Sequence, residues 1–273
     1  MSPPGAAAPR EPWQLTLYRR GLKKRLTVRA VLDNLPAVDG RRCLEIGCAT
    51  GITSWFLRRH GGTWISGDFD AEQTRSAAEI VDRVVHLGHT GLPFADASFD
   101  VVAGINFLEH LRDDAHWVRE MRRVLRPGGE LLLVAPSGET GRPGFLVKRW
   151  FGLTADRGGL GHARDGYPPD AARRLFEANG WTVERVGDYC KFFSETLEDF
   201  LNGLFRKRTA GAGAKDFHGN TAPTSQASLR KAGMAYRVYG WLLPLFRAWA
   251  ALDGLLPASR GYMILLRARR PAA

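Results

Sequence analysis

Cysteine is scarce in this sequence, with three residues among 273. Cys43, Cys48 and Cys190 form neither an even set nor a C-x-x-C pair, so the sequence offers no disulfide framework. We therefore expect a reduced, cytoplasmic compartment. An apolar segment of the signal-peptide kind is also missing from the start of the chain, and residues 1–12 are expected to form a disordered tail.

Long uninterrupted apolar runs are absent as well. The most apolar stretch, residues 236–256, is broken by Arg237, Pro244, Arg247 and Asp253 into runs shorter than the roughly 20 residues that span a bilayer. Its tryptophans and flanking arginines suit an interfacial helix. The alternative, which we favour, is a helix that packs over the sheet and helps to enclose an acceptor.

Acidic residues are too few to balance the basic ones, and the net charge is +11. Residues 1–30 contain seven Lys and Arg against one acid, and residues 201–273 contain twelve against two. The stretch between them, residues 31–200, has 20 basic and 25 acidic residues. Basic ends suggest a polyanionic partner, such as anionic lipid head groups, a phosphorylated carrier or nucleic acid, or simply a solvated face.

Short apolar segments alternate with amphipathic ones along the chain. This alternation predicts a parallel sheet with helices on both faces. We divide the chain into the tail, an N-terminal basic helix, a core, a helical insertion that caps an acceptor, and a last strand with a short tail. Their bounds are 1–12, 13–36, 37–190, 191–260 and 261–273.

A glycine-rich loop, GCATG at residues 47–51, follows the first expected strand and opens a helix. Such a loop lets backbone approach a ligand, and the helix directs its free N–H groups at it. Asp68 ends the second strand, where a carboxylate can accept hydrogen bonds from both hydroxyls of a ribose. The spacing is neither G-x-G-x-x-G nor G-x-x-x-x-G-K-[ST], which disfavours a dinucleotide and a nucleoside triphosphate.

The segment Glu45–Gly51 (EIGCATG) resembles the first motif of class I S-adenosylmethionine (SAM)-dependent methyltransferases, E/D-x-G-x-G-x-G. Further segments resemble motifs of that family in the same order: Asp68, Gly91–Phe94 with Ser98–Asp100, Leu108–His110 and Arg123–Gly129. The resemblance covers roughly residues 40–187, with 261–269 as the last, antiparallel strand. It implies a Rossmann-like α/β fold with a seven-stranded, mostly parallel sheet and helices on both faces. To this fold the sequence pattern adds an N-terminal basic helix and a helical insertion before the last strand.

The resemblance also implies SAM as the cofactor and assigns roles within its site. Glu45 would approach the methionine ammonium group through the loop, and Asn106 would line the methionine end. Asp68 would hold the ribose, and Phe69 would pack on the adenine. The loop residues expected to wrap the methionine and ribose are Gly47, Cys48, Ala49 and Gly51.

Two departures from the family pattern stand out. Ala49 replaces the middle glycine, which the fold tolerates if φ stays negative there. The family often has G-D-A where this chain has Leu87-Gly88-His89. We therefore expect Gly88 and His89 to meet adenine through backbone or imidazole.

SAM brings its own electrophile, so the protein must mainly orient the acceptor, and a hydroxyl acceptor also needs a base. His162, in the loop over the expected acceptor pocket, is our preferred base, with Arg164 and Tyr167 lining that pocket. The alternative is a structural lid that these side chains hold shut. His110 is the second candidate base, unless it only caps its loop together with Glu109.

No metal is expected, because Asn106 replaces the first acid of the E-x-x-E-H pattern with which some related methyltransferases hold a divalent cation. The sequence thus predicts a SAM-dependent methyltransferase acting on a small-molecule or lipid-linked acceptor, with peripheral contact to an anionic membrane at its inner face as a further partner. An RNA methyltransferase and a non-catalytic SAM-binding protein remain alternatives. RNA is less favoured, because the basic surplus lies outside the core and no N-P-P-Y motif follows the fourth strand.

Overall fold

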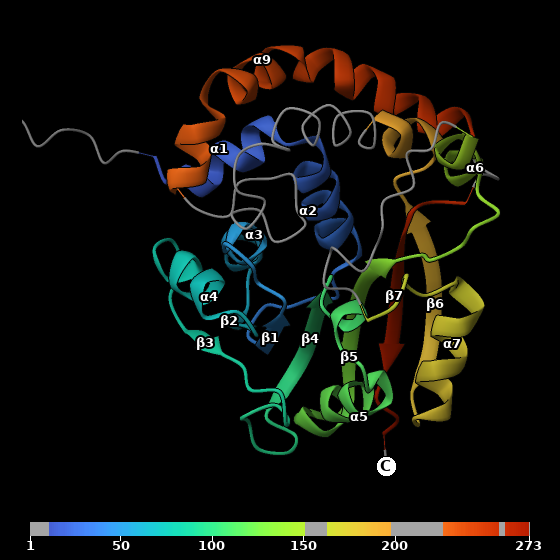
Figure 1. Ribbon diagram of the computed structural model, residues 1–273. Helices are drawn as coiled ribbons and strands as arrows, with labels where there is room; N and C mark the ends of the chain where they lie inside the picture. The colour runs from blue at the N-terminus through green and yellow to red at the C-terminus, as the bar shows by residue number, and fades with distance from the viewer. Residues whose placement is uncertain (1–10, 151–162, 198–225, 257–259, 273) are drawn as a thin grey trace, which may run out of the picture.

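The computed structural model describes residues 11–150, 163–197, 226–256 and 260–272 (Figure 1). Its helices are α1 (Trp13–Arg20), α2 (Leu22–Asn34), α3 (Ile52–His60), α4 (Ala71–Ala78), η1 (Leu108–His110), α5 (Asp114–Val124), α6 (Pro143–Trp150), α7 (Pro169–Ala178), α9 (Gln226–Ala251) and η4 (Leu252–Leu255). Its strands are β1 (Arg42–Ile46), β2 (Thr63–Asp68), β3 (Val84–His86), β4 (Phe99–Ile105), β5 (Leu125–Pro136), β6 (Thr182–Tyr189) and β7 (Met263–Arg269).

The strands form one seven-stranded sheet in the order β3-β2-β1-β4-β5-β7-β6. Strands β1 to β5 pair in parallel, and β7 lies antiparallel between β5 and β6. The Rossmann-like fold predicted from the sequence is therefore confirmed. The chain runs outward from β1 in one direction and from β4 in the other, and ligands of such sheets bind outside the carboxyl ends of the strands at this reversal.

Both faces of the sheet are buried at its central strands β1 and β4, as expected for parallel strands covered by helices, whereas the edge strands β3 and β6 have no buried residue. Every residue of β4 is buried. Leu44 and Ile46 of β1 pack in one cluster with Trp117 of α5, whereas Cys43 packs in another with Val31 of α2. The alternation along β1 thus places α5 and α2 on opposite faces, and the loops at the strand ends are held between them.

The N-terminal basic segment differs from the single helix predicted over residues 13–36. It is two helices separated by Gly21, whose backbone is extended at φ −102° and ψ 113°. A Cβ on Gly21 would lie 2.6 Å from the carbonyl oxygen of Leu17, so the tight turn depends on glycine. The backbone N–H of Leu22, at the start of α2, donates to the Tyr239 hydroxyl of α9 at 3.1 Å. Contact with a distant helix therefore helps to place the break.

Helix α9 runs across α1 and α2 at the top of Figure 1. It has 26 residues and keeps its helical path through Pro244, which the sequence analysis had treated as an interruption. Leu243 and Ala250 are buried with Leu22 of α2. Among the helices that the structure describes, none combines the length and apolar character needed to cross a bilayer.

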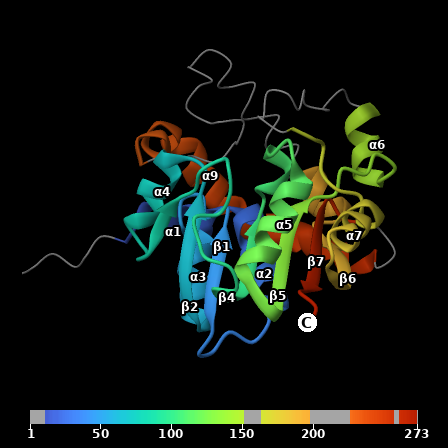
Figure 2. The same ribbon diagram turned by 90° about the horizontal axis from the view of Figure 1, so that it is seen from below.

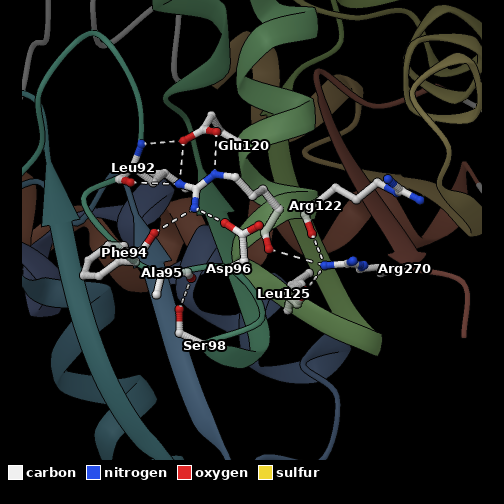
Figure 3. Close-up of polar contacts among 10 residues, drawn as sticks. Leu92, Phe94, Ala95, Asp96, Ser98, Glu120, Arg122, Leu125 and Arg270 are labelled. Carbon is white, nitrogen blue, oxygen red and sulfur yellow. Dashed lines mark hydrogen bonds and ion pairs between the residues drawn. The ribbon is translucent and has the colours of Figure 1, made fainter. Parts of the chain in front are cut away.

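Arg123 of α5 joins two of the segments that resemble methyltransferase motifs. Its guanidinium donates to the carbonyl oxygens of Leu92 and Phe94 at 2.9 and 2.8 Å, and to Asp96 at 2.7 Å. It also pairs with Glu120 on the same helix at 2.7 Å. Figure 3 shows these four partners gathered at one point. The loop before β4 is thereby fixed to α5.

Candidate cofactor and acceptor site

The loop at residues 47–51 passes close to the end of β4. Gly47 has φ 88°, and a Cβ there would lie 2.2 Å from the carbonyl oxygen of Ile105. Gly51 has φ 83° and precedes the first residue of α3. The N–H groups of Gly47 and Cys48 both donate to the carbonyl of Gly67, at 2.9 and 3.1 Å. The loop is thus bound to β2 and β4 through backbone atoms, in a conformation that glycine permits.

Ala49 does not have the negative φ that we expected of it. Its φ is 47°, in the left-handed region, where an L-residue carries a penalty of roughly 1–2 kcal/mol. The Ala49 N–H donates to Oδ2 of Asp68 at 2.8 Å, and this bond helps to hold the unfavourable conformation. The reason for the error is that the path of the loop, not the residue type, sets φ here.

Asp68 therefore supports the loop as well as ending β2. Its Oδ1 accepts a hydrogen bond from the N–H of Asp70 at 3.0 Å. Burial raises the pKa of the Asp68 carboxyl, although the N–H groups of Asp70 and Ala49 oppose that shift. Each carboxylate oxygen has a further lone pair, so both can still accept a bond from a ribose hydroxyl.

Glu45 lies inside the protein, below the loop. The side chain is fully buried, and its Oε2 accepts hydrogen bonds from the hydroxyls of Ser54 and Ser66 at 2.5 and 2.6 Å. Burial raises the pKa of this carboxyl. Glu45 therefore links α3 to β2 under the loop, and its approach to a methionine ammonium group stays a prediction. Burial also raises the pKa of the Cys48 thiol, which fits a small, unreactive neighbour of the cofactor.

An aromatic group stands beyond the end of β2. Phe69 stacks on His89 with ring centroids 5.5 Å apart, and on Phe107 at 6.1 Å. Trp117 meets Phe69 edge-on at 5.0 Å. Nothing lies within 4 Å of a Cβ placed on Gly88, next to the exposed His89. These side chains offer a flat surface beside open space, suited to an adenine ring.

Two buried polar atoms in the loops that meet here have no hydrogen-bond partner among the described residues. They are Oγ1 of Thr50 and Oδ1 of Asn106. Asn106 itself follows β4 with φ 48°, and its N–H donates to the carbonyl of Val134 at 2.8 Å. Because an unpaired buried polar atom is costly, these atoms fit a site completed by a polar ligand.

Glu109 was absent from the residues predicted to form the site, yet it is unusual. Its side chain is 2% exposed, and its Oε2 has no hydrogen-bond partner within the described part of the chain. Burial raises the pKa of this carboxyl from 4.5 to about 7. Nε2 of His110, a side chain that is 42% exposed, lies 3.9 Å from the other carboxylate oxygen. The Leu-Glu-His motif indicated this position, but the predicted site included only its histidine.

The predicted acceptor residues are engaged with protein groups. Arg164 pairs with Asp114 and donates to two carbonyls of the turn before α5, at 3.1 and 2.8 Å. Tyr167 is buried, and its hydroxyl donates to the carbonyl of Leu108 at 3.2 Å. Both side chains thus fasten their segment to η1 and α5, in line with the structural alternative, and their contact with an acceptor stays a prediction. His162 lies outside the described residues.

Metal ligands do not gather in the described ranges: no group of three or more His, Cys, Asp or Glu side chains could hold an ion there. The site assembled so far is a backbone loop, an acid at the end of β2, an aromatic surface and the Glu109–His110 pair. All of them lie at the carboxyl ends of β1, β2 and β4.

Comparison with known proteins finds a family match for the part of the chain that carries the site. Residues 44–133 match the family model described as a methyltransferase domain. Residues 44–133 thus match a methyltransferase domain, and the sheet around them has the fold of class I SAM-dependent methyltransferases. The matched residues of this methyltransferase domain include the glycine-rich loop, Asp68 and the Glu109–His110 pair, and its cofactor is SAM.

Relatives of the methyltransferase domain align over part of their length. The 27-O-demethylrifamycin SV methyltransferase of Amycolatopsis mediterranei is 37% identical over 118 residues, which are 40% of this chain and 43% of that protein. A probable SAM-dependent methyltransferase of Mycolicibacterium smegmatis is 38% identical over 108 residues, 38% of this chain and 42% of the relative. A tRNA U34 carboxymethyltransferase of Trichlorobacter lovleyi is 30% identical over 112 residues, 38% and 34% of the two chains. The aligned stretch spans less than half of each relative.

The fold is also found among solved structures. A SAM-dependent methyltransferase from Mesorhizobium loti superposes with a TM-score of 0.55 and 17% identity, over 92% of this chain and all of the other. At this identity the likeness shows the fold alone. The described residues outside 44–133 therefore belong to a fold that this neighbour shares, and their contacts with an acceptor have to be argued from the structure itself.

Proposed function

We propose that this chain transfers the methyl group of SAM to a small-molecule or lipid-linked acceptor. One observation supports the proposal above all: the loop at 47–51, with positive φ at its two glycines and at Ala49, is fixed by Asp68 at the sheet reversal. Loops of this kind at that position place backbone N–H groups and an acid around a nucleoside.

The residues present fit the cofactor. Asp68 would accept hydrogen bonds from the ribose hydroxyls, and the adenine would pack on Phe69. Oγ1 of Thr50 and Oδ1 of Asn106, which lack partners among the described residues, would form hydrogen bonds with polar groups of the methionine end. When bound, SAM supplies a methyl group on a sulfonium, which is electrophilic without further activation. The chain then has to orient the acceptor, exclude water and remove a proton from a hydroxyl or amino acceptor.

The Glu109–His110 pair is our candidate for removing that proton. A carboxyl with a pKa of about 7 is close to the ideal for a general base at neutral pH. The imidazole of His110 is partly exposed, and its Nε2 lies 3.9 Å from Oε1 of the buried Glu109 carboxyl. We infer that His110 meets the acceptor and that Glu109 shares the proton. His162 stays the other candidate, as predicted from the sequence.

The acceptor class is the open part of the proposal. One relative is named for a rifamycin derivative and another for a tRNA, so relatives act on both small molecules and RNA. We favour a small or lipid-linked acceptor because residues 31–200, which carry the site, have an acidic surplus, whereas the basic surplus lies at the chain ends. The three cysteines are buried, which supports a reducing compartment, and we place the protein on the cytoplasmic side of a membrane.

The test is to incubate the full chain with methyl-labelled SAM and separate lipid, small-molecule and RNA fractions of its host. We expect label in the lipid or small-molecule fraction, identified there by mass spectrometry. Label in RNA alone would instead support the RNA methyltransferase. Binding of SAM with no transfer to any fraction would leave a non-catalytic SAM-binding protein.

The base can be tested in the same assay once an acceptor is known. Glu109→Gln should lower kcat and remove the rise of kcat/KM with pH near about 7. Glu177→Gln, on the exposed side of α7, is the matched control and should leave the profile unchanged. A variant at Glu109 that keeps the wild-type profile would exclude the pair as the proton acceptor.

A further inference from the structure

Helix α9 is apolar on two sides, and only one of them is covered by residues that the structure describes. The inner side packs on α1 and α2: Leu243 and Ala250 are buried, and Tyr239 and Phe246 are partly buried beside them. The outer side consists of Val238, Trp241, Leu242, Leu245 and Trp249, which we call the outer stripe. These residues recur at helical spacing, so they form a second continuous face.

The outer stripe is strongly exposed for such apolar side chains. Trp241 is 72% exposed and Leu245 is 65% exposed. At 100° per residue the five side chains fall within an arc of roughly 100°, whose centre lies roughly 120° around the helix from that of the face that packs on the protein. A cluster of exposed Trp and Leu on one face marks a surface that contacts another apolar phase or molecule.

Arginines border the outer stripe along one side. Arg20 of α1 and Arg237 of α9 line a cleft of about 280 Å³ together with Gly240 and Trp241. A Cβ on Gly240 would lie 3.1 Å from Cδ of Arg20, so the glycine lets the stem of that arginine cross the helix. Arg247 of α9 is also exposed, although it lies farther around the helix from the outer stripe than Arg237 does.

The charges of these arginines are not neutralised within the described structure. The ion pairs between described residues include neither Arg20 nor Arg237 nor Arg247. They belong to the two chain ends that hold the basic surplus, residues 1–30 and 201–273. Guanidinium groups without an ion pair attract anions, and the outer stripe favours an apolar environment. We therefore expect a partner that is both anionic and apolar.

We propose that the outer stripe and its arginines dock on the surface of an anionic lipid bilayer. The stripe would enter the boundary between head groups and acyl chains, where tryptophan is favoured, and the Arg20–Arg237 cleft would take a lipid phosphate. A second copy of the chain fits less well, because a two-fold contact through this face would bring like-charged arginines together.

The placement of α9 gives this docking a consequence for the site. The arrowhead of β6 points toward α9 in Figure 1, and β6 runs in the same direction as the parallel strands. The membrane-facing helix thus lies at the carboxyl-end side of the sheet, where the loop at 47–51 also lies. A lipid-linked acceptor could reach the site from the bilayer, although docking itself does not depend on methyl transfer.

The test is co-sedimentation of the purified full chain with vesicles, without SAM. Vesicles of phosphatidylcholine with phosphatidylglycerol should bind the chain, and vesicles of phosphatidylcholine alone should bind it at least about tenfold more weakly. Binding should also fall as salt is added. The double variant Trp241→Ser/Leu245→Ser should lose at least about tenfold in affinity, because two large apolar side chains no longer enter the lipid.

Matched controls are available on other helices. Leu146→Ser/Trp150→Ser removes an equally exposed leucine and tryptophan from α6, which stands clear of α9 in Figure 2, and should leave binding unchanged. Arg237→Glu should weaken binding, whereas Arg174→Glu, the same charge change on α7, should weaken it much less. All substitutions are at the surface, so thermal melting should confirm that each variant is folded.

Three results would overturn the proposal. The first is wild-type binding that is absent or independent of phosphatidylglycerol. The second is equal loss in the α6 and α9 double variants. The third is the absence of vesicle binding together with a dimer of the wild type in sedimentation velocity that Trp241→Ser/Leu245→Ser dissociates. That result would assign the outer stripe to contact with a second copy of the chain. None of these results would bear on methyl transfer, which is measured separately.

Discussion

The ionisation of Glu109 should make the protein less stable as pH rises, and Glu109→Gln should remove that loss. In the folded protein, burial raises the pKa of this carboxyl to about 7, against 4.5 for an exposed glutamate. Below the lower value both the folded and the unfolded carboxyl are protonated. Between the two values the unfolded chain releases its proton while the folded chain keeps it, so the free energy of unfolding falls.

The size of this effect follows from the two pKa values. One pKa unit corresponds to about 1.4 kcal/mol, so the shift of Glu109 amounts to about 3 kcal/mol, reached above about pH 7. Glutamine has the same shape and does not titrate. The free energy of unfolding of Glu109→Gln, minus that of the wild type, should therefore increase by about 3 kcal/mol between about pH 4 and pH 8.

Urea denaturation at a series of pH values measures this difference directly. Subtracting the wild type cancels groups that titrate alike in both proteins. Glu177→Gln, an exposed substitution on α7, is the control and should give a difference that stays within about 0.5 kcal/mol across the range. A Glu109→Gln difference that does not change with pH would refute a buried, protonated carboxyl, and with it the candidate base.

Other substitutions test the packing around the site. Arg123→Ala should lower the free energy of unfolding by about 2–4 kcal/mol, measured in urea, because two carbonyls and two carboxylates lose their donor. The ion pair of Arg142 and Glu195 spans 2.7 Å, and both side chains are at most 2% exposed. In the same assay Arg142→Ala should therefore lower the free energy of unfolding by about 3–5 kcal/mol, because it leaves a buried carboxylate without its partner. The double variant Arg142→Met/Glu195→Leu should lower it much less, because neither charge remains. Gly47→Ala should abolish SAM binding in calorimetry and lower the melting temperature, because its Cβ would lie 2.2 Å from a carbonyl oxygen. Gly40 also has a positive φ, but nothing lies within 4 Å of a Cβ placed there, so Gly40→Ala should keep SAM binding.

The strand order and the position of the cofactor loop could be predicted from the sequence because both depend on local signals. Short apolar strands alternate with helices, and Gly47 and Gly51 bracket the turn into α3. The family resemblance then supplied the antiparallel last strand. These features are set by neighbouring residues, which a single sequence displays.

The features that were missed depend on contacts between distant segments. The positive φ of Ala49 is held by Asp68, and the break at Gly21 is supported by Tyr239. The raised pKa of Glu109 arises from its burial, and burial of a polar residue in a loop cannot be predicted from the sequence. Likewise, the sequence showed that residues 236–256 are apolar, but not that one face of the helix would remain uncovered.

The account's central claim is that the loop at 47–51 and Asp68 together hold SAM. Titration calorimetry of SAM with the full chain tests it, using Asp68→Ala and, as the control, Asp70→Ala, which removes the N-cap of α4 two residues away. We expect the wild type and Asp70→Ala to bind alike, and Asp68→Ala to bind at least about thirtyfold more weakly, since two hydrogen bonds to a carboxylate are worth at least about 2 kcal/mol. Absence of binding to the wild type, or equal binding by Asp68→Ala, would contradict the claim.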